Sequence, residues 1–205
     1  METNRFSGCI AVLTMLIAVM AVSCSTTSYL KVTYQLPGAD AGPAGKTVFL
    51  KVTDDTGGTP FLGPNAKEEL KHFTGLFSLS VEGKLPKPTM EGAYDTAGVF
   101  DTAFRRRLSA AGVTIADSAG GGVPTLLINL AAFQIDMSGR KWTTRLDYVA
   151  SMRLNGEALT TQTVSGSAER AKIVGIGDAE TLLGETVTSM VNQLDLKKLF
   201  AHPQL

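Results

Sequence analysis

Hydrophobic and polar residues alternate along residues 29–36, a pattern that is typical of a half-buried β-strand. In residues 29–36, Leu30, Val32 and Tyr34 fall on one side, and polar residues fall between them. Strands are also predicted at six later segments: 47–53, 76–81, 113–115, 125–137, 146–154 and 158–170. Asn155-Gly156 is a strong hairpin signal. The last three segments therefore predict a three-stranded antiparallel meander.

Two other segments repeat their apolar residues at helical spacing. The first covers residues 96–111, where Asp95 is a predicted N-terminal cap and Gly112 a predicted stop. The second begins at Asp178, which we expect to cap it, and its apolar stripe extends to Leu194. A short helix is predicted from Pro64 to about residue 73, because proline fits the first helical position.

These elements predict an α+β fold, with a mostly antiparallel or mixed sheet and two main helices packed on one face. The chain has 205 residues, 44% of them hydrophobic and 19% charged, which suits one packed domain. We expect three regions: residues 1–23 as a lipoprotein signal peptide, 24–28 as a lipidated cysteine with a short tether, and 29–205 as a single α+β periplasmic domain.

The N-terminal prediction rests on an apolar stretch over residues 9–22, which is shorter than the roughly 20 residues that span a bilayer. It fits the hydrophobic region of a secretory signal. Residues 21–24 (AVSC) resemble the lipobox of bacterial lipoproteins. A plain signal peptide with an incidental cysteine and a permanent N-terminal membrane anchor are the alternatives.

The lipobox resemblance implies cleavage between Ser23 and Cys24, a diacylglycerol such as dipalmitoylglycerol on the Cys24 thiol, and an acyl chain on its new amine. By the same resemblance, Ser25 in place of aspartate favours the outer membrane of a diderm bacterium over the inner membrane. Several acyl chains hold a protein stably where a single chain does not.

Charge and composition limit the kinds of ligand and cofactor that the protein is expected to bind. Nineteen basic and 19 acidic residues give a net charge of zero, which disfavours nucleic-acid binding. Two cysteines and two histidines leave no four-ligand zinc site and no disulfide framework. Once Cys24 carries lipid, the mature domain has no free thiol. We therefore expect no cofactor apart from the covalent lipid, and no metal.

No segment carries a catalytic signature, so we predict a protein that is not an enzyme. His72 and His202 lie in poor positions for a catalytic triad. The sequence Gly175-Ile176-Gly177 lacks the remaining features of a phosphate loop. Asp54-Asp55 supplies too few oxygens for a calcium loop, and a turn at the end of a strand is the simpler interpretation.

Five residues are candidates for contact with a partner or lipid: Arg107, Trp142, Leu196, Leu199 and Phe200. Arg107 follows Phe104 by three residues, which places it in the middle of a predicted apolar helix face. Its head either reaches water, pairs with a carboxylate or contacts a lipid headgroup or partner. Trp142 lies among basic residues at a predicted hairpin, and either contacts a membrane or partner or closes one end of the core.

The three C-terminal candidates fall outside the apolar stripe of the last predicted helix. Either that helix breaks near Asp195, or Leu196, Leu199 and Phe200 pack elsewhere.

The order of elements resembles the YajG-type family of bacterial envelope lipoproteins over residues 46–200. The resemblance rests on these segments: KTVFLKVTD, Phe61-Leu62-Gly63, LSAAGVTIAD, PTLLINLAAFQID and ETVTSMVNQL. It is also similar to auxiliary lipoproteins of ABC transporters and to LptE-like lipoproteins. The resemblance implies a non-catalytic protein, anchored in the outer membrane and facing the periplasm.

Two functional hypotheses follow. The first is an adaptor, or an assembly or transport accessory, that binds another envelope protein through sheet edges or loops. The alternative is a lipid or glycolipid carrier, which predicts an apolar pocket of at least about 300 Å³ between sheet and helices. A hydrolase that depends on His72 is a more distant third.

Overall fold

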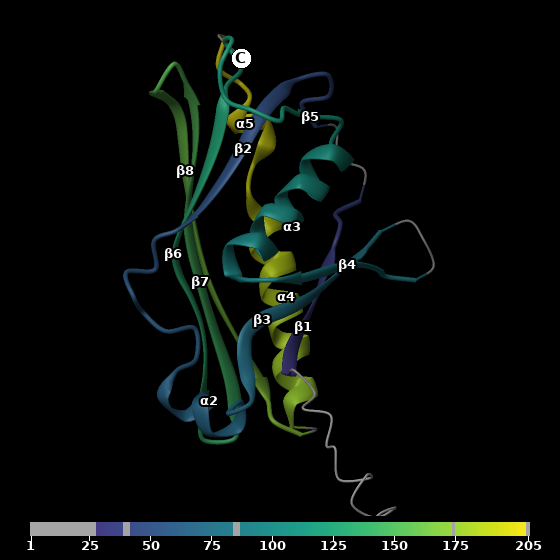
Figure 1. Cartoon of the computed structure of the whole chain (residues 1–205), viewed down its shortest axis with the longest axis vertical. Helices are drawn as coiled ribbons and strands as arrows, with labels where there is room; N and C mark the ends of the chain where they lie inside the picture. Colours follow the sequence, from purple (N-terminus) through teal and green to yellow (C-terminus); the bar gives the residue numbers. More distant parts are fainter. Residues whose placement is uncertain (1–27, 39–41, 84–86, 174, 204–205) are drawn as a thin grey trace, which may run out of the picture.

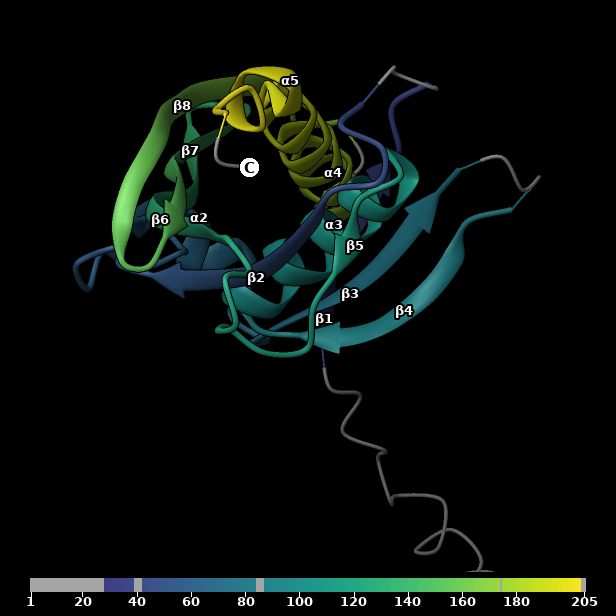
Figure 2. The same cartoon turned by 90° about the horizontal axis from the view of Figure 1, so that it is seen from above.

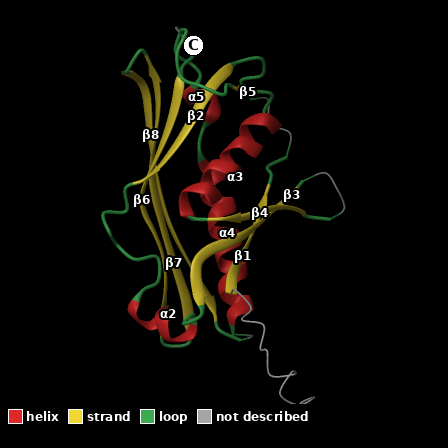
Figure 3. Cartoon of the chain, in the orientation of Figure 1, coloured by secondary structure: helices red, strands yellow, loops and turns green. Residues whose placement is uncertain are grey.

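The protein folds around two β-sheets and two long helices (Figure 1). It is described here by a computed structural model that covers residues 28–38, 42–83, 87–173 and 175–203. The large sheet lies on one side of the molecule, and both long helices and the small sheet lie on the other (Figure 3). The predicted α+β class is confirmed, although the strands form two sheets and not one.

The large sheet has the order β5-β2-β6-β7-β8. Its strands are β2 (Thr47–Asp54), β5 (Thr114–Ile115), β6 (Thr125–Ser138), β7 (Lys141–Leu154) and β8 (Glu157–Ala171). β6, β7 and β8 form the predicted antiparallel meander, and β2 runs parallel to both β5 and β6. Asn155 and Gly156 have φ of 52° and 91°, which suits the tight turn that was predicted there.

The small sheet has the order β1-β3-β4, with strands β1 (Ser28–Gln35), β3 (Phe73–Glu82) and β4 (Thr89–Tyr94). β1 is parallel to β3, and β3 is antiparallel to β4. None of the residues of β4 is fully buried, so its apolar and polar residues alternate only weakly. The hydrophobic pattern therefore did not indicate this strand.

The two long helices are α3 (Thr96–Ala110) and α4 (Ile176–Gln193), and both pack on the same face of the large sheet. The Phe104 ring of α3 meets Tyr148 of β7 edge-on, with centroids 5.6 Å apart. From α4, the Thr186 hydroxyl lies 2.7 Å from the Thr144 hydroxyl of β7. Figure 2 shows the large sheet curving around the side where these helices lie.

The helix ends follow the expected chemistry at one position and depart from it at another. The Asp95 carboxylate accepts the Gly98 N–H at 2.8 Å, so the predicted cap of α3 is confirmed. Gly175, with φ of 69°, is the cap residue of α4, where Asp178 was expected. Asp178 lies in the first turn and accepts the Ile173 N–H instead.

The short helices are α2 (Pro64–Glu69), with proline in its first turn, and α5 (Leu196–Leu199).

Side chains fill the space between the large sheet and the helices. Five phenylalanines contact one another there, with ring centroids 5.0 to 5.9 Å apart: Phe61, Phe73, Phe77, Phe100 and Phe133. Ile128 of β6 and Leu183 of α4 are also fully buried in the core. The core thus occupies the position where the carrier hypothesis places its ligand.

β1 and α4 run side by side in the same direction, which gives the molecule two distinct ends. The Lys31 N–H donates to Glu180 near the start of both elements, at 3.0 Å. Near their ends, the Asn192 side chain donates to the Gln35 carbonyl at 2.9 Å. We call the end where β1 and α4 begin the proximal end, and the end where they finish the distal end. The 18 residues of α4 span about 27 Å between them.

None of the helices in the described ranges is both long and apolar enough to cross a membrane.

Candidate functional site

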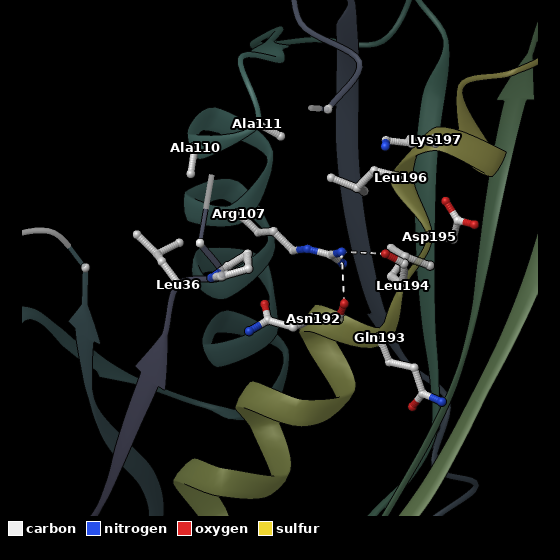
Figure 4. A pocket seen from close by; sticks show the side chains of 14 residues that line it. Leu36, Arg107, Ala110, Ala111, Asn192, Gln193, Leu194, Asp195, Leu196 and Lys197 are labelled. Atoms are coloured by element: carbon white, nitrogen blue, oxygen red, sulfur yellow. Dashed lines mark hydrogen bonds between the residues drawn. The ribbon is translucent and has the colours of Figure 1, made fainter. Parts of the chain in front are cut away.

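A cavity of about 720 Å³ lies at the distal end, and we call it the distal cavity. Its walls come from five places: the segment after β1, the residue after β3, the last turn of α3, the end of α4 and the start of α5 (Figure 4). Leu36, Ala111 and Leu196 contribute apolar surface, while Asn192 and Lys197 contribute polar groups. The cavity therefore combines apolar walls with hydrogen-bonding groups, as ligand sites commonly do.

Arg107 extends from α3 to the end of α4 and lines this cavity (Figure 4). Its guanidinium donates to the main-chain carbonyls of Val191, Asn192 and Leu194, with Nη2 3.1 Å from the Asn192 oxygen. The last carbonyls of a helix have no partner within the helix, and they carry the negative end of its dipole. Arg107 therefore holds the end of α4 in place by both hydrogen bonds and charge.

Only 5% of the Arg107 surface is exposed, so its head is buried where the first interpretation of the sequence expected it to reach water. The reason is the distance in sequence between donor and acceptors. The carbonyls belong to residues 84 to 87 positions later, and the helical pattern around Arg107 gives no information about them.

The turn between α4 and α5 is fixed by a second set of hydrogen bonds. The Asp195 carboxylate accepts the Lys198 N–H at 2.9 Å and caps α5. The Gln162 amide of β8 donates to the Asp195 carbonyl at 2.8 Å and accepts the Asp195 N–H at 3.1 Å. This wall of the distal cavity is therefore held by hydrogen bonds within the protein itself.

The predicted break in the last helix is confirmed, since α4 ends at Gln193 and α5 begins at Leu196. Leu196, Leu199 and Phe200 turn into the core and are buried, where contact with a partner had been expected of them. Leu199 and Phe200 therefore present almost no surface to a partner, whereas Leu196 also lines the distal cavity.

Two tyrosines adjoin the residues that line the cavity. The Tyr34 hydroxyl donates to the Asn192 side chain at 2.8 Å, and the Tyr148 hydroxyl donates to the Met190 carbonyl at 2.9 Å. Burial raises the pKa of both hydroxyls above the ordinary value of 10.0, and the Arg107 charge acts in the opposite direction. Both tyrosines are therefore neutral hydrogen-bond donors at physiological pH, and they position α4.

Trp142 lies at the proximal end, far along β7 from the distal cavity. It is fully buried, and its indole N–H donates to the Gly175 carbonyl at 3.3 Å. The Lys172 ammonium lies 5.9 Å from the centre of its ring. This placement agrees with the interpretation that Trp142 closes one end of the core, and it leaves the indole no surface for contact with a membrane or partner.

The other candidate groups have local structural roles. Asp54 accepts the Thr56 N–H, and Asp55 accepts from the Asn129 amide, which stabilises the turn after β2. His72 is exposed in the turn between α2 and β3. In the described part of the chain, no three histidine, cysteine, aspartate or glutamate side chains are grouped as metal ligands are. Ser23 and Cys24 lie outside the described residues.

Sequence reasoning named two residues of the distal cavity, Arg107 and Leu196. It missed Asn192, Asp195 and Lys197, which come together only because α4 stops at Gln193. One feature of the sequence pointed to this turn: the apolar residues after α4 do not continue the apolar stripe of that helix.

No family model and no curated protein matches this sequence. Solved structures do resemble its fold. A Xanthomonas campestris protein described by the family model DUF330 is 12% identical, with a TM-score of 0.49 over 80% of this chain and 92% of that one. The rare lipoprotein B from Shewanella oneidensis is 11% identical, with a TM-score of 0.43 over 72% of this chain and 89% of that one.

A hypothetical protein from Chlamydia trachomatis is 10% identical, with a TM-score of 0.43 over 78% of this chain and all of that one. These three TM-scores are below 0.5, and none of the three descriptions mentions the YajG-type family. The function proposed below therefore depends on the residues of this chain.

Proposed function

We propose that the protein is a non-catalytic lipoprotein, anchored by lipid on Cys24 in the outer membrane of a diderm bacterium, that binds another envelope protein in the distal cavity. The lipobox-like residues 21–24 and the apolar stretch before them support the anchor. Within this class, the order of elements favours a relative of the YajG-type lipoproteins.

The position of the distal cavity is the observation that carries the proposal. Ser28, where β1 begins, is four positions after Cys24, and four fully extended residue steps span at most about 14 Å. The proximal end is therefore kept close to the lipid. The cavity lies at the opposite end of α4, about 27 Å away along the helix axis. That position favours a partner in the periplasm.

The chemistry of the cavity suits a protein segment. Arg107 and Lys197 bring positive charge, Asn192 and Asp195 bring hydrogen-bonding groups, and Leu36 brings apolar surface. Because the turn at Asp195 is already fixed by Gln162, a partner would meet a formed surface, which lowers the entropy cost of binding.

A lipid or glycolipid carrier is the second candidate. The cavity volume of about 720 Å³ exceeds the 300 Å³ or so that such a ligand needs, and this favours it. Against it, the cavity lies at the distal end, away from the membrane that would supply the lipid.

Site-specific photo-crosslinking in intact cells tests the proposal on the full-length protein. A benzophenone amino acid replaces Ala110, which lines the cavity, or Ser109, an exposed neighbour on the same helix that does not. We expect a discrete protein adduct from position 110 and none from position 109.

The other outcomes count against partner binding. An adduct at position 110 whose added mass is that of a lipid supports the carrier. Equal adducts at both positions, or none at either, contradict the assignment of the distal cavity as the binding site.

A further inference from the structure

Exposed hydrophobic side chains gather at the proximal end. Among the described residues, four large hydrophobic side chains are exposed: Tyr29 (40%), Met90 (67%), Ile173 (82%) and Ile176 (44%). Tyr29 is the second residue of β1, and Ile173 and Ile176 flank the start of α4. Three of the four therefore lie at the proximal end, where β1 and α4 begin (Figure 1).

The loop that carries the two isoleucines is held at both sides. The Lys172 N–H donates to the Arg140 carbonyl at 2.9 Å, and the Ile173 N–H donates to Asp178 at 2.6 Å. The Gly175 carbonyl accepts the indole N–H of Trp142. Since Trp142 already closes the core at this end, Ile173 is directed into solvent, and it does not pack inward.

Two ion pairs lie beside this loop. Lys172 pairs with Glu69 at 2.5 Å, and Lys141 pairs with Glu169 at 2.6 Å. These two lysines are therefore paired with carboxylates, and the exposed isoleucines offer apolar side chains for insertion into a membrane surface. Tyrosine is suited to the same boundary, because its ring is apolar and its hydroxyl remains hydrated.

We propose that Ile173 and Ile176, with Tyr29 at the same end of the molecule, insert into the surface of the phospholipid membrane that holds the lipid on Cys24. The tether of at most about 14 Å keeps these side chains within reach of that membrane. The protein then stands on its proximal end, with the distal cavity held away from the bilayer. This inference rests on the proposed lipid anchor.

A fluorescent label tests the contact in the mature, lipidated protein. The sequence has two cysteines, Cys9 in the expected signal peptide and Cys24 at the lipid site, so Ile173→Cys supplies the one free thiol. The thiol is labelled with a polarity-sensitive dye, and the protein is reconstituted into phosphatidylcholine vesicles with and without a nitroxide-labelled lipid. Ile176→Cys is a second position, in case the first variant folds poorly.

Met90→Cys is the matched control. Met90 is also an exposed hydrophobic residue, but it pairs with Ser80 near the distal half of the small sheet. We expect a blue shift of the dye and a loss of its emission to the nitroxide lipid at position 173, and neither change at position 90.

The results separate the contact from the anchor on which it depends. Intact mass of the same sample shows whether Cys24 carries lipid, so an absent anchor contradicts the proposed function and is recognised as such. With the anchor present, equal emission and quenching at positions 173 and 90 overturn the inference. A blue shift at position 173 without quenching by nitroxide lipid also overturns it, because protein and not lipid then covers the isoleucines.

Discussion

Replacing Arg107 with methionine should release the end of α4. Methionine keeps most of the apolar stem that packs in α3 but removes all the donors of the guanidinium. The carbonyls of Val191, Asn192 and Leu194 then lose this partner, and the hydrogen bonds to Val191 and Leu194 are buried.

The size of the effect follows from those two buried carbonyls. A buried polar group that loses its partner costs about 1–3 kcal/mol, and hydrogen bonds to a charged group are at the stronger end. The hydrogen bonds share one side chain and are not additive, so we expect Arg107→Met to lower the free energy of unfolding by about 3 kcal/mol. With a urea dependence of about 1–3 kcal/mol per molar, the unfolding midpoint falls by about 1–3 M.

The neighbouring Arg106 provides the control. Its side chain is 51% exposed and pairs with Glu91 at 2.6 Å, so Arg106→Met should cost less than about 1 kcal/mol. Urea unfolding of both variants, followed by circular dichroism, measures the difference. If Arg107→Met lies within about 1 kcal/mol of Arg106→Met, Arg107 does not hold the end of α4.

Four further predictions follow from the surroundings of single residues. A Cβ at Gly184 would lie 2.9 Å from a main-chain oxygen of β1, so Gly184→Ala should lower stability by roughly 1–3 kcal/mol. A Cβ at Gly177 meets nothing within 4 Å, so Gly177→Ala should raise stability by about 0.5–1 kcal/mol. If thermal unfolding shows Gly184→Ala to be more stable than Gly177→Ala, the packing of α4 is contradicted. Asp95→Ala removes the cap of α3 and should cost about 1 kcal/mol in urea unfolding, and an unchanged midpoint would exclude a capping role. Burial raises the pKa of Tyr34 and Tyr148 above 10.0, so above about pH 10 the unfolded chain loses protons that the folded chain keeps, and stability falls as pH rises. The urea midpoint should fall less steeply between about pH 9 and about pH 11 in Tyr148→Phe, and an identical slope would contradict this cause.

Local patterns predicted most of the elements, because each depends on neighbouring residues. Phe100 and Phe104 recur at helical spacing in α3, and Asp95 caps it as expected. The turn at Asn155-Gly156 depends only on its own backbone preference. What these patterns did not specify was the separation of β1 and β3 into a second sheet, because pairing between strands is not local.

The distal cavity was harder to predict, because its residues come from distant parts of the chain. Arg107 was correctly placed on the apolar face of α3, yet its carbonyl partners are 84 or more positions away. Trp142 was placed at a hairpin among basic residues, but β7 begins at Lys141, and Trp142 therefore joins the inward-facing side of that strand. A shift of a few residues in a strand boundary decides whether such a side chain is buried.

The lipid on Cys24 is the claim on which the rest of the account depends. Intact mass spectrometry of the full-length gene product, purified from membranes, tests it most directly. We predict a chain that begins at Cys24 and carries the added mass of a diacylglycerol and one further acyl chain. A chain of unmodified mass that begins at another residue would contradict the anchor, the orientation of the distal cavity and the membrane contact of Ile173 together.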